Sequence, residues 1–296
     1  MCGIAGFISK YCNETVLERM GEIISHRGPD DTGYYLQDGV GLVLKRLSII
    51  DIDNGKQPAY NENDNVVVIL NGEIFNYASL REELKQKGHK ISNNSDTAVL
   101  PHMYEEFGLS MFERLSGQFA IAVYDTVSGM LVLARDRMGI IPLNFYYKND
   151  EFIFASEIKA ILASGRVNRE LSAAALFELF TFCLLPGEYL MLRNGKIKRD
   201  KFYRLKYKEI DHHKDFDTSA GEIEDILCRA VRKRLIGDVK ICTYLSGGLD
   251  SSLITSIIAG KYDSSVEAFS VCFEDPFFNE YDYQKLVCHR LGIKQH

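Results

Sequence analysis

Several features are missing from this sequence, and each absence argues against a class of protein. No apolar stretch approaches the ~18 residues that a membrane-spanning helix needs. The amino terminus lacks a basic region followed by an apolar run, so we expect no secretory signal peptide. The net charge is −6 and no long basic run is present, which argues against a nucleic-acid partner. We therefore expect a cytoplasmic protein that binds neither membranes nor nucleic acids.

The sequence also lacks the cysteine patterns of a disulfide framework or a metal site. The seven cysteines include no C-x-x-C pair, so the sequence predicts neither a disulfide framework nor a zinc site. His212 and His213 are adjacent in a polar segment, and we interpret them as surface residues, so no metal ligand is predicted. The remaining composition is that of a folded protein, with 46% hydrophobic residues and six prolines. Its 296 residues are enough for two domains, each with a sizeable core.

Cys2 directly follows the initiator methionine, which is usually removed when the next residue is small. Cys2 would then carry both a thiol and a free α-amine. An α-amine has a pKa of ~7.7–8.0 and a free thiol one of ~8.5. Near neutral pH the amine can therefore accept the thiol proton, which makes one residue both nucleophile and base. The alternative is a small buried cysteine at the start of an edge strand.

Apolar spacing predicts the secondary structure of the first two thirds of the chain. The predicted helices span 15–25, a segment around Leu80 and Leu84 that Gly88 ends, and 96–107; the predicted strands span 34–37, 41–50, 65–70, 119–125, 130–136, 144–147 and 152–156. Runs of strands with helices gathered between them favour antiparallel sheets flanked by helices over a doubly wound fold.

Polar residues near the predicted strand ends are candidates for binding and catalysis. The Asn71 amide and the Gly72 N–H can donate to the oxyanion of an acyl-transfer reaction, each donor being worth about 2.7–4 kcal/mol. The alternative is a simple Asn-Gly turn. Arg46 can bind the carboxylate of an amino acid, and Glu73 and Asp96 can bind its ammonium. Taken alone, each of these three residues is better interpreted as a solvated surface charge.

Eight motifs, four of which contain these residues, follow one another along the chain. In order, they are MCGIAG (1–6), SHRGPD (25–30), RLSIID (46–51), NGEIFNY (71–77), SDT (95–97), GQFA (117–120), ARDRMG (134–139) and FASEIKA (154–160). This series resembles the class II glutamine amidotransferase domain, specifically that of glutamine-hydrolysing asparagine synthetases. The stretch 176–189 is shorter than the family pattern.

The resemblance implies a fold and a set of site residues. The fold implied is the α+β N-terminal-nucleophile hydrolase sandwich, four layers in the order αββα. Cys2 would be the nucleophile, and Asn71 with Gly72 the oxyanion hole. The implied glutamine-binding residues are Arg46, Leu47, Ile49, Ile50, Glu73 and Asp96.

A second pattern begins after a charged segment that we interpret as a linker, 206–218. A capping box at Ser219 to Glu222 predicts a helix to about Leu235. An apolar strand, 239–245, then leads into SGGLDSS (246–252) and a helix from Leu253. A strand, a glycine-rich turn and a helix N-terminus present backbone N–H groups to phosphate, although no Walker loop is present.

This loop resembles the pyrophosphate loop of ATP pyrophosphatases, which implies ATP and Mg²⁺ as cofactors. The implied ATP-binding residues are Leu245, Ser246, Gly247, Gly248, Asp250, Ser251, Ser252 and Val271. Only two strands of the expected α/β sheet are counted before the sequence ends, where about 5–6 are usual. We therefore predict an amidotransferase domain over 2–205, a linker over 206–218, and a truncated amino-terminal part of an asparagine synthase ATP-pyrophosphatase domain over 219–296.

The leading functional hypothesis is a glutamine-dependent asparagine synthetase whose small-molecule substrates are glutamine, aspartate and ATP. One alternative amidates another carboxylate, on a sugar or a secondary metabolite, because the acceptor-binding segment is absent. Another is a fragment with glutaminase activity alone. A catalytically idle binding module is a further hypothesis, but the joint presence of Cys2, Arg46, Asn71, Glu73 and Asp96 argues against it. The sequence leaves open whether the protein forms a homodimer.

Overall fold

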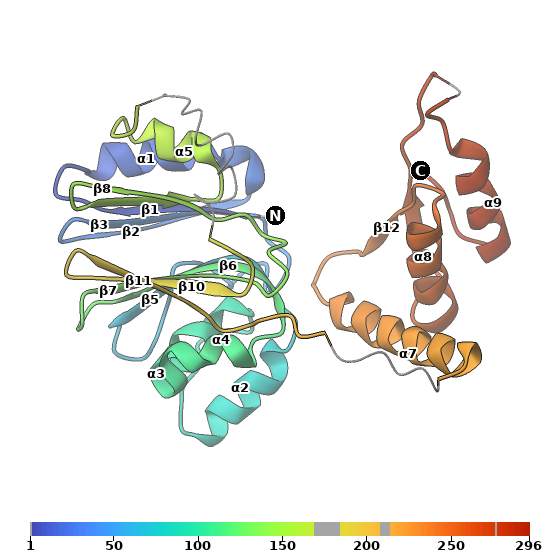
Figure 1. Ribbon diagram of the computed structural model, residues 1–296, viewed down its shortest axis with the longest axis horizontal. Coiled ribbons are helices and arrows are strands. Elements are labelled where there is room, and N and C mark those ends of the chain that lie inside the picture. The colour runs from blue at the N-terminus through green and yellow to red at the C-terminus, as the bar shows by residue number, and fades with distance from the viewer. Residues whose placement is uncertain (1, 169–183, 208–213, 276) are drawn as a thin grey trace. The chain divides into compact units, whose positions relative to one another are not determined.

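The computed structural model describes residues 2–168, 184–207, 214–275 and 277–296. It divides the chain into two units, residues 1–206 and 207–296, and each is described here by itself (Figure 1). The stretch 176–189 and the linker 206–218, which the sequence singled out, lie partly outside the described residues. None of the described helices is both long enough and apolar enough to cross a membrane.

The first unit contains two antiparallel sheets. The five-stranded sheet has the order β2 (Asp31–Gln37), β3 (Val40–Arg46), β1 (Gly3–Ile8), β9 (Glu151–Ala155), β8 (Asn144–Lys148). The six-stranded sheet has the order β11 (Lys196–Lys201), β10 (Glu188–Arg193), β7 (Met130–Arg135), β6 (Gly117–Asp125), β5 (Val66–Ile74), β4 (Ala59–Tyr60).

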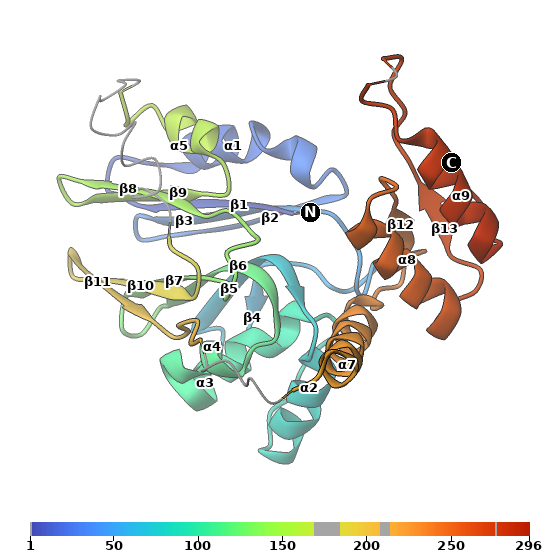
Figure 2. The same cartoon turned by 45° about the vertical axis from the view of Figure 1, so that its right-hand side comes forward.

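Helices cover the outer faces of both sheets, as the two views show (Figures 1 and 2). The five-stranded sheet is covered by α1 (Glu14–Glu22) and α5 (Ile158–Ala163), and the six-stranded sheet by α2 (Tyr77–Gln86), α3 (Leu100–Phe107) and α4 (Met111–Arg114). Short 3₁₀ turns, η1 (Ser25–Arg27), η2 (Thr97–Val99) and η3 (Gly108–Ser110), complete these connections. The predicted four-layer αββα sandwich is confirmed.

Three apolar clusters fill the spaces between the layers. The central cluster joins the two sheets and includes Leu42 and Leu44 from β3 and Ile69 from β5, all fully buried. The second packs the six-stranded sheet against its helices, and the third packs α1 and α5 against β1 and β9. Because the inner faces pack on each other and the outer faces pack on helices, several strands are nearly continuous apolar runs, which made them predictable from the sequence.

Two details of the first unit differ from the sequence predictions. The strand predicted over 41–50 ends at Arg46, because the guanidinium of Arg46 binds the carbonyl groups of residues 50–52 and folds the chain back into a loop. Asn71 and Gly72 do not form a turn. Both lie inside β5, which runs to Ile74 and pairs with β6 along its whole length.

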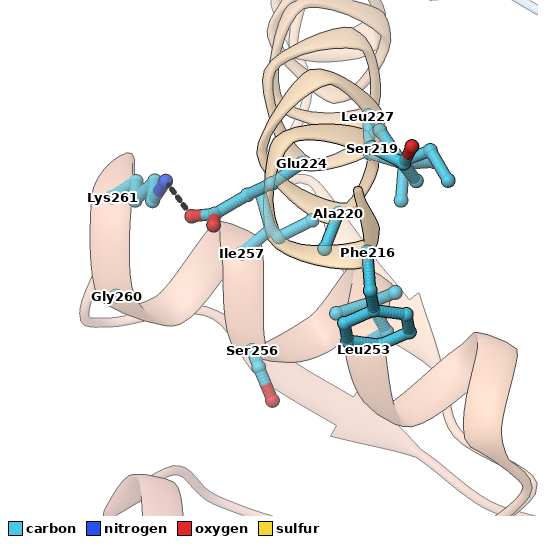
Figure 3. Close-up of a pocket in the computed structure, with 11 residues that line it drawn as sticks. Phe216, Ser219, Ala220, Glu224, Leu227, Leu253, Ser256, Ile257, Gly260 and Lys261 are labelled. Atoms are coloured by element: carbon cyan, nitrogen blue, oxygen red, sulfur yellow. Dashed lines mark hydrogen bonds and ion pairs between the residues drawn. The ribbon is translucent and has the colours of Figure 1, made fainter. Parts of the chain in front are cut away.

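The second unit contains α7 (Phe216–Arg234), β12 (Cys242–Tyr244), α8 (Leu249–Lys261), β13 (Glu267–Phe269) and α9 (Tyr281–Leu291). Strands β12 and β13 are parallel, and Gln295 forms a further parallel bridge to Ala268. This is the start of the expected α/β arrangement. Along one side, α7 and α8 border an open, mostly apolar groove of about 750 Å³ (Figure 3).

Both helix starts predicted in this unit were wrong by several residues. Helix α7 begins at Phe216 and is capped by Asp215, whose Oδ1 accepts the N–H of Thr218 at 2.7 Å, so Ser219 lies inside the helix. Helix α8 begins at Leu249 and not at Leu253. Asp250 and Ser251 therefore belong to its first turn, where backbone N–H groups have no partner within the helix. The N–H of Ser252 makes the first such bond, to the carbonyl oxygen of Gly248 at 3.1 Å.

Candidate active site

A small pocket at one end of the first unit collects nearly all the residues that the sequence singled out for glutamine chemistry. Cys2 precedes β1, Arg46 ends β3, Glu73 lies in β5, and Asp96 precedes η2. The lining residues are Cys2, Arg46, Leu47, Ile49, Ile50, Gly55, Gln57, Gly72, Glu73, Ser95, Asp96 and Thr97. Segments far apart in the sequence thus meet where the two sheets end together.

The thiol of Cys2 lies against the backbone of Leu47. The Leu47 N–H points at Sγ at 3.4 Å, and Sγ lies 3.6 Å from the Leu47 carbonyl oxygen. Burial raises the pKa of the Cys2 thiol, and the Leu47 backbone contact opposes that shift only in part. A thiol with a raised pKa needs a base close by before it can act as a nucleophile near neutral pH.

An arginine that the sequence analysis left without a role holds the backbone of the same cysteine. Arg27 Nε donates to the carbonyl oxygen of Cys2 at 2.9 Å, while its Nη1 lies 3.1 Å from Glu157 Oε1. Burial alone would raise the pKa of this carboxyl, but hydrogen bonds from Lys159, Arg27 and His26 lower that pKa to about 2. Glu157 is therefore an ionised partner that fixes Arg27, and through Arg27 the position of Cys2.

Arg46 is buried and organises the loop that follows β3. Its Nη2 donates to the carbonyl oxygens of Ile50 and Asp51 at 3.1 and 2.8 Å, and its Nη1 donates to that of Ile52 at 2.9 Å. These bonds use three of the five guanidinium N–H donors. The arrangement also requires a glycine at position 55, since a Cβ there would lie 2.5 Å from Arg46 Nη2.

Glu73 and Asp96 form an acidic pair in the pocket. Asp96 is buried, and its Oδ2 accepts the N–H of Ile74 at 2.9 Å. Burial raises the pKa of both carboxyls, and the negative charge of Asp96 raises that of Glu73 further. Two carboxyls that resist ionising together are stabilised by a cation placed between them, and an ammonium group is such a cation.

Asn71 and Gly72 are neighbours in β5, but only Gly72 lines the pocket. Asn71 is fully buried; its Nδ2 donates to Ser156 Oγ at 3.2 Å, and it is not itself among the lining residues. Gly72 does line the pocket and has a φ of +136°, which few other residues adopt. A Cβ at Gly72 would lie 2.0 Å from the carbonyl oxygen of Gln118, so only glycine fits.

Two polar residues that sequence reasoning missed support this part of the site. Ser156 is buried, and its Oγ also accepts the N–H of Ile4 at 3.0 Å, so it joins Asn71 to β1. Gln57 lines the pocket, and its Oε1 accepts the N–H of Leu70 at 2.7 Å. Ser156 stands in one of the motifs that carried the family resemblance, so a signal was present there without an assigned role. Nothing in the sequence pointed to Gln57.

The pocket encloses about 20 Å³. That is room for about one water molecule and not for an amino acid. Any amino acid that binds there must therefore displace part of the lining, and the loop over residues 47–56 supplies several of the lining residues.

In the second unit, the glycine-rich loop before α8 is held by its own serines. Ser246 Oγ lies 3.0 Å from Ser251 Oγ and accepts the N–H of Gly248 at 3.3 Å. Gly247 has a φ of +89°, and Gly248 is the N-cap of α8. Ser252 Oγ is buried without a hydrogen-bond partner in the part of the chain that the structure describes. A loop with an unpartnered hydroxyl at a helix N-terminus fits a phosphate group.

The other residues predicted for the nucleotide lie close to this loop or on its flank. Leu245 is fully buried under it, whereas Val271 is half exposed. Gln284 of α9, which the sequence analysis did not single out, donates its Nε2 to the carbonyl oxygens of Ser246 and Val271 at 3.4 and 3.2 Å. One side chain thus ties the loop to Val271. The exposed Asp250 offers the carboxylate that a phosphate-bound Mg²⁺ uses as a ligand.

Two family models together match nearly the whole chain. One, described as the glutamine amidotransferase domain, matches residues 1–213, and one described as asparagine synthase matches residues 222–296. Among solved structures, glutamine PRPP amidotransferase from B. subtilis aligns with a TM-score of 0.55 at 17% identity, over 90% of this chain and 65% of that one. At this identity the likeness shows the shared fold alone.

Curated relatives extend the match across both units. Asparagine synthetase [glutamine-hydrolyzing] 1 of Bacillus subtilis is 33% identical over 99% of this chain and 49% of its own length. Asparagine synthetase B of Escherichia coli is 34% identical over 87% of this chain and 44% of its own. Amidase chry2 of Gibberella zeae is 32% identical over 88% of this chain and 43% of its own length. The chain spans about half the length of these curated relatives.

The αββα sandwich, the pocket around Cys2 and the two family matches agree with one another. The chain belongs to the glutamine amidotransferase family, and its amidotransferase domain is followed by an asparagine synthase segment, as in the glutamine-hydrolysing asparagine synthetases.

Proposed function

We propose that the first unit hydrolyses glutamine at Cys2 and that the ammonia is used to amidate aspartate after ATP has activated it. The observation that carries the first half is the pocket, in which Cys2, Arg46, Gly72, Glu73 and Asp96 meet although they come from four separate segments. The second half is supported by the glycine-rich loop before α8 and by the names of the curated relatives.

Glutamine hydrolysis requires that Met1 has been removed, because this frees the α-amine of Cys2. That amine takes the proton from Sγ, and the sulfur attacks the carboxamide carbon of glutamine. The carbonyl oxygen becomes an oxyanion that accepts from Asn71 Nδ2 and from the N–H of Gly72. When the tetrahedral intermediate collapses, the C–N bond breaks and the ammonium of Cys2 returns its proton to the departing ammonia. Water then hydrolyses the thioester, which releases glutamate and restores the thiol.

The charges at the other end of the pocket fix the orientation of glutamine. Arg46 has guanidinium donors beyond the three that bind the loop, and these bind the α-carboxylate. Glu73 and Asp96 bind the α-ammonium, which relieves the repulsion between the two carboxyls. A substrate held at both of its backbone charges presents its carboxamide to Cys2.

In the second unit, Ser246, Gly247, Gly248, Asp250, Ser251 and Ser252 would hold the phosphates of ATP, with Mg²⁺ balancing their charge. ATP supplies an adenylate leaving group that makes a carboxylate reactive toward ammonia. Leu245 lies beneath the loop and Val271 beside it, on the flank that we assign to the adenosine.

A second candidate function uses the same glutamine chemistry with a different acceptor. The match to amidase chry2, whose name indicates no asparagine product, favours keeping this candidate. None of the proposed glutamine or ATP contacts distinguishes aspartate from another carboxylate. The acceptor is therefore tested by supplying ATP with different carboxylic acids to the whole protein and measuring AMP release.

Ammonia release from glutamine tests the first half of the proposal. Replacing Cys2 by Ala should lower the rate by at least about 10⁴-fold, as expected when a nucleophile is removed. A form that retains Met1 or carries an uncleaved amino-terminal tag should be nearly as inactive, because its Cys2 nitrogen is an amide and no longer a base. Hydrolysis by the tagged form at the untagged rate would show that another group takes the thiol proton.

A further inference from the structure

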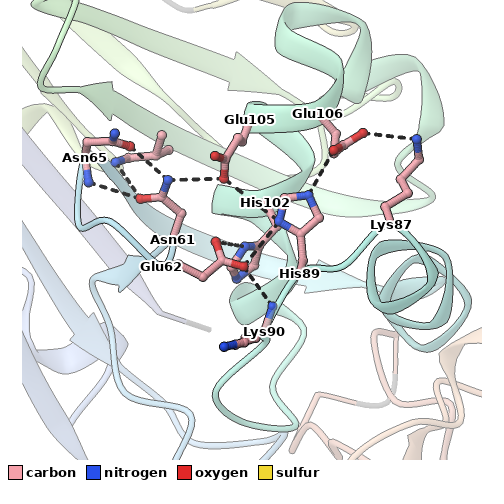
Figure 4. A network of polar contacts seen from close by, with 10 residues as sticks. Asn61, Glu62, Asn65, Lys87, His89, Lys90, His102, Glu105 and Glu106 are labelled. Carbon is pink, nitrogen blue, oxygen red and sulfur yellow. Dashed lines mark hydrogen bonds and ion pairs between the residues drawn. The ribbon is translucent and has the colours of Figure 1, made fainter.

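A cluster of imidazoles and carboxylates lies in the first unit, away from the residues that line the glutamine pocket. Its members come from three segments: Glu62 follows β4, His89 follows α2, and His102 and Glu105 belong to α3 (Figure 4). One ligand atom of each residue lies within 4.8 Å of all the others. We propose that these four residues form a binding site for a divalent transition-metal ion, with Zn²⁺ as the best fit.

Three of the distances between potential ligand atoms are close to those of tetrahedral coordination. His89 Nδ1 lies 3.3 Å from Glu62 Oε1 and 3.9 Å from Glu105 Oε2, and His102 Nδ1 lies 3.1 Å from Glu62 Oε2. Zinc bound to nitrogen at ~2.0–2.1 Å and oxygen at ~2.0–2.2 Å separates its ligand atoms by about 3.4 Å. Small side-chain shifts are enough to place all four atoms around one ion.

His102 provides an independent reason to place a cation here. Its side chain is only 3% exposed, and its Nδ1 is buried with no hydrogen-bond partner in the described part of the chain. Glu62 Oε2 lies 3.1 Å from this nitrogen, close enough for an ion pair when the imidazole is protonated. A buried ring nitrogen that makes no hydrogen bond is costly, and a metal ion would satisfy it.

A carboxylate outside the cluster fixes the orientation of the other imidazole. Glu106 Oε1 lies 3.1 Å from His89 Nε2 and is itself held by Lys87 Nζ, 3.0 Å from its other oxygen. A histidine that donates one ring N–H to a carboxylate leaves its second nitrogen available as a metal ligand, and this pairing is typical of zinc sites. His89 therefore directs Nδ1 toward Glu62 and Glu105.

The two carboxylates that complete the set are also held in place. Glu62 Oε1 accepts the N–H of Lys90 at 2.7 Å, and Glu105 Oε2 accepts from Asn61 Nδ2 at 3.2 Å. Two nitrogen and two oxygen ligands suit Zn²⁺ and not Mg²⁺, which prefers oxygen alone. A bound ion would join the β4–β5 connection, the end of α2 and the middle of α3, and thus tie together the helical layer beneath the six-stranded sheet.

The proposal is tested with the whole chain, stripped of metal by a chelator and titrated with Zn²⁺ alone in a calorimeter. The wild type should bind one equivalent that His89→Gln and Glu105→Gln both lose, with affinity reduced by at least about 100-fold, whereas Glu106→Gln should weaken the same site by about 10-fold. The matched control is His289→Gln, which removes an exposed histidine of α9 and should leave this equivalent intact.

Two more measurements distinguish a metal site from an ion-pair network and from metal binding by cysteine. In metal-free buffer His89→Gln and Glu105→Gln should melt at the wild-type temperature. Zn²⁺ should raise the melting temperature of the wild type, of the control and, by less, of Glu106→Gln, but not that of His89→Gln or Glu105→Gln. With Co²⁺ in place of Zn²⁺, the equivalent lost in His89→Gln should show no thiolate absorption, which separates it from the cysteines. Equal Zn²⁺ binding by the wild type, His89→Gln and Glu105→Gln, or no binding by any of them, would overturn the proposal and leave the cluster as an ion-pair network.

Discussion

The two units hold their candidate sites in opposite ways. In the first, the side chains of Arg46, Asn71 and Asp96 are buried and each is fixed by backbone or buried partners. In the second, Ser246 and Asp250 are exposed, and the bonds of the loop run mainly between its own residues. The first site thus depends on how the two sheets pack against each other. The second site depends mainly on one local turn. Substitutions should therefore disturb the first unit far more than the second.

A matched pair of glycines tests this contrast with the largest expected effect. Gly72→Ala places a Cβ against the Gln118 carbonyl at a φ of +136°, so we expect a loss of about 3 kcal/mol or more in stability together with loss of glutaminase activity. Gly248→Ala, at a φ of −72° and with only Ser246 Oγ at 3.4 Å, should fold normally and hydrolyse glutamine at the wild-type rate. Thermal melts of both variants measure the difference. If Gly72→Ala and Gly248→Ala melted at the same temperature, the two units would not differ in their tolerance of substitutions.

A smaller effect is expected when a buried amide is removed without strain. Asn71→Ala should lower kcat for glutamine by about 10²–10³-fold with KM little changed, because an oxyanion donor acts mainly in the transition state. Ser156→Ala should lower kcat by about fivefold, since its bond to Asn71, worth about 1 kcal/mol, only orients that amide. Loss of its second bond, to the N–H of Ile4, should lower stability. Steady-state kinetics separate the two. If Ser156→Ala were as damaging as Asn71→Ala, Ser156 would have a role of its own in the reaction.

The last of these effects is a pH dependence confined to the first unit. Burial raises the pKa of Glu73 and of Asp96, so the pair takes up protons as the pH falls through the neutral range. Because the ammonium of glutamine favours the ionised pair, binding releases protons, and KM for glutamine should rise as the pH falls, by at most about tenfold per pH unit for each proton released.

A variant of the acidic pair provides the control for this pH effect. Glu73→Gln should weaken binding at high pH and flatten the profile, because one of the two coupled carboxyls is gone. Direct titration of glutamine binding at several pH values distinguishes this effect from the ionisation of Cys2, which changes kcat. A KM that is independent of pH in the wild type would contradict the assignment of Glu73 and Asp96 to the ammonium.

Sequence patterns predicted the layers better than the loops. The apolar runs of β5, β6 and β7 are unambiguous because both faces of the six-stranded sheet are covered. The end of β3 was mispredicted because the mostly apolar residues 47–50 continue the strand pattern, and only the contacts of Arg46 show that the chain turns away. The start of α8 was placed late because the turn residues 249–252 are compatible with either a loop or a helix.

The candidate site was predictable where motifs carry it and unpredictable where tertiary contacts do. Cys2, Arg46, Glu73 and Asp96 each stand in a recognisable motif, and the structure brings them to one pocket. Gln57 and Gln284 act on backbone groups of residues distant in the sequence, which no local pattern reveals. The same is true of the proposed metal site, whose ligands are spread from Glu62 to Glu105, and only the last two have regular helical spacing.

The bonds between Arg46 and the loop carbonyls have a kinetic consequence. In this conformation the pocket has room for about one water molecule, so part of its lining must move before glutamine binds, and the loop over residues 47–56 supplies several of the lining residues. Opening the loop would break up to three hydrogen bonds to one guanidinium, whose other donors are the ones that we assign to the incoming carboxylate. Binding of glutamine would thus take two steps, a first-order opening of the loop and a bimolecular encounter with the substrate. Its observed rate should level off at high glutamine concentration, at the intrinsic opening rate of the loop.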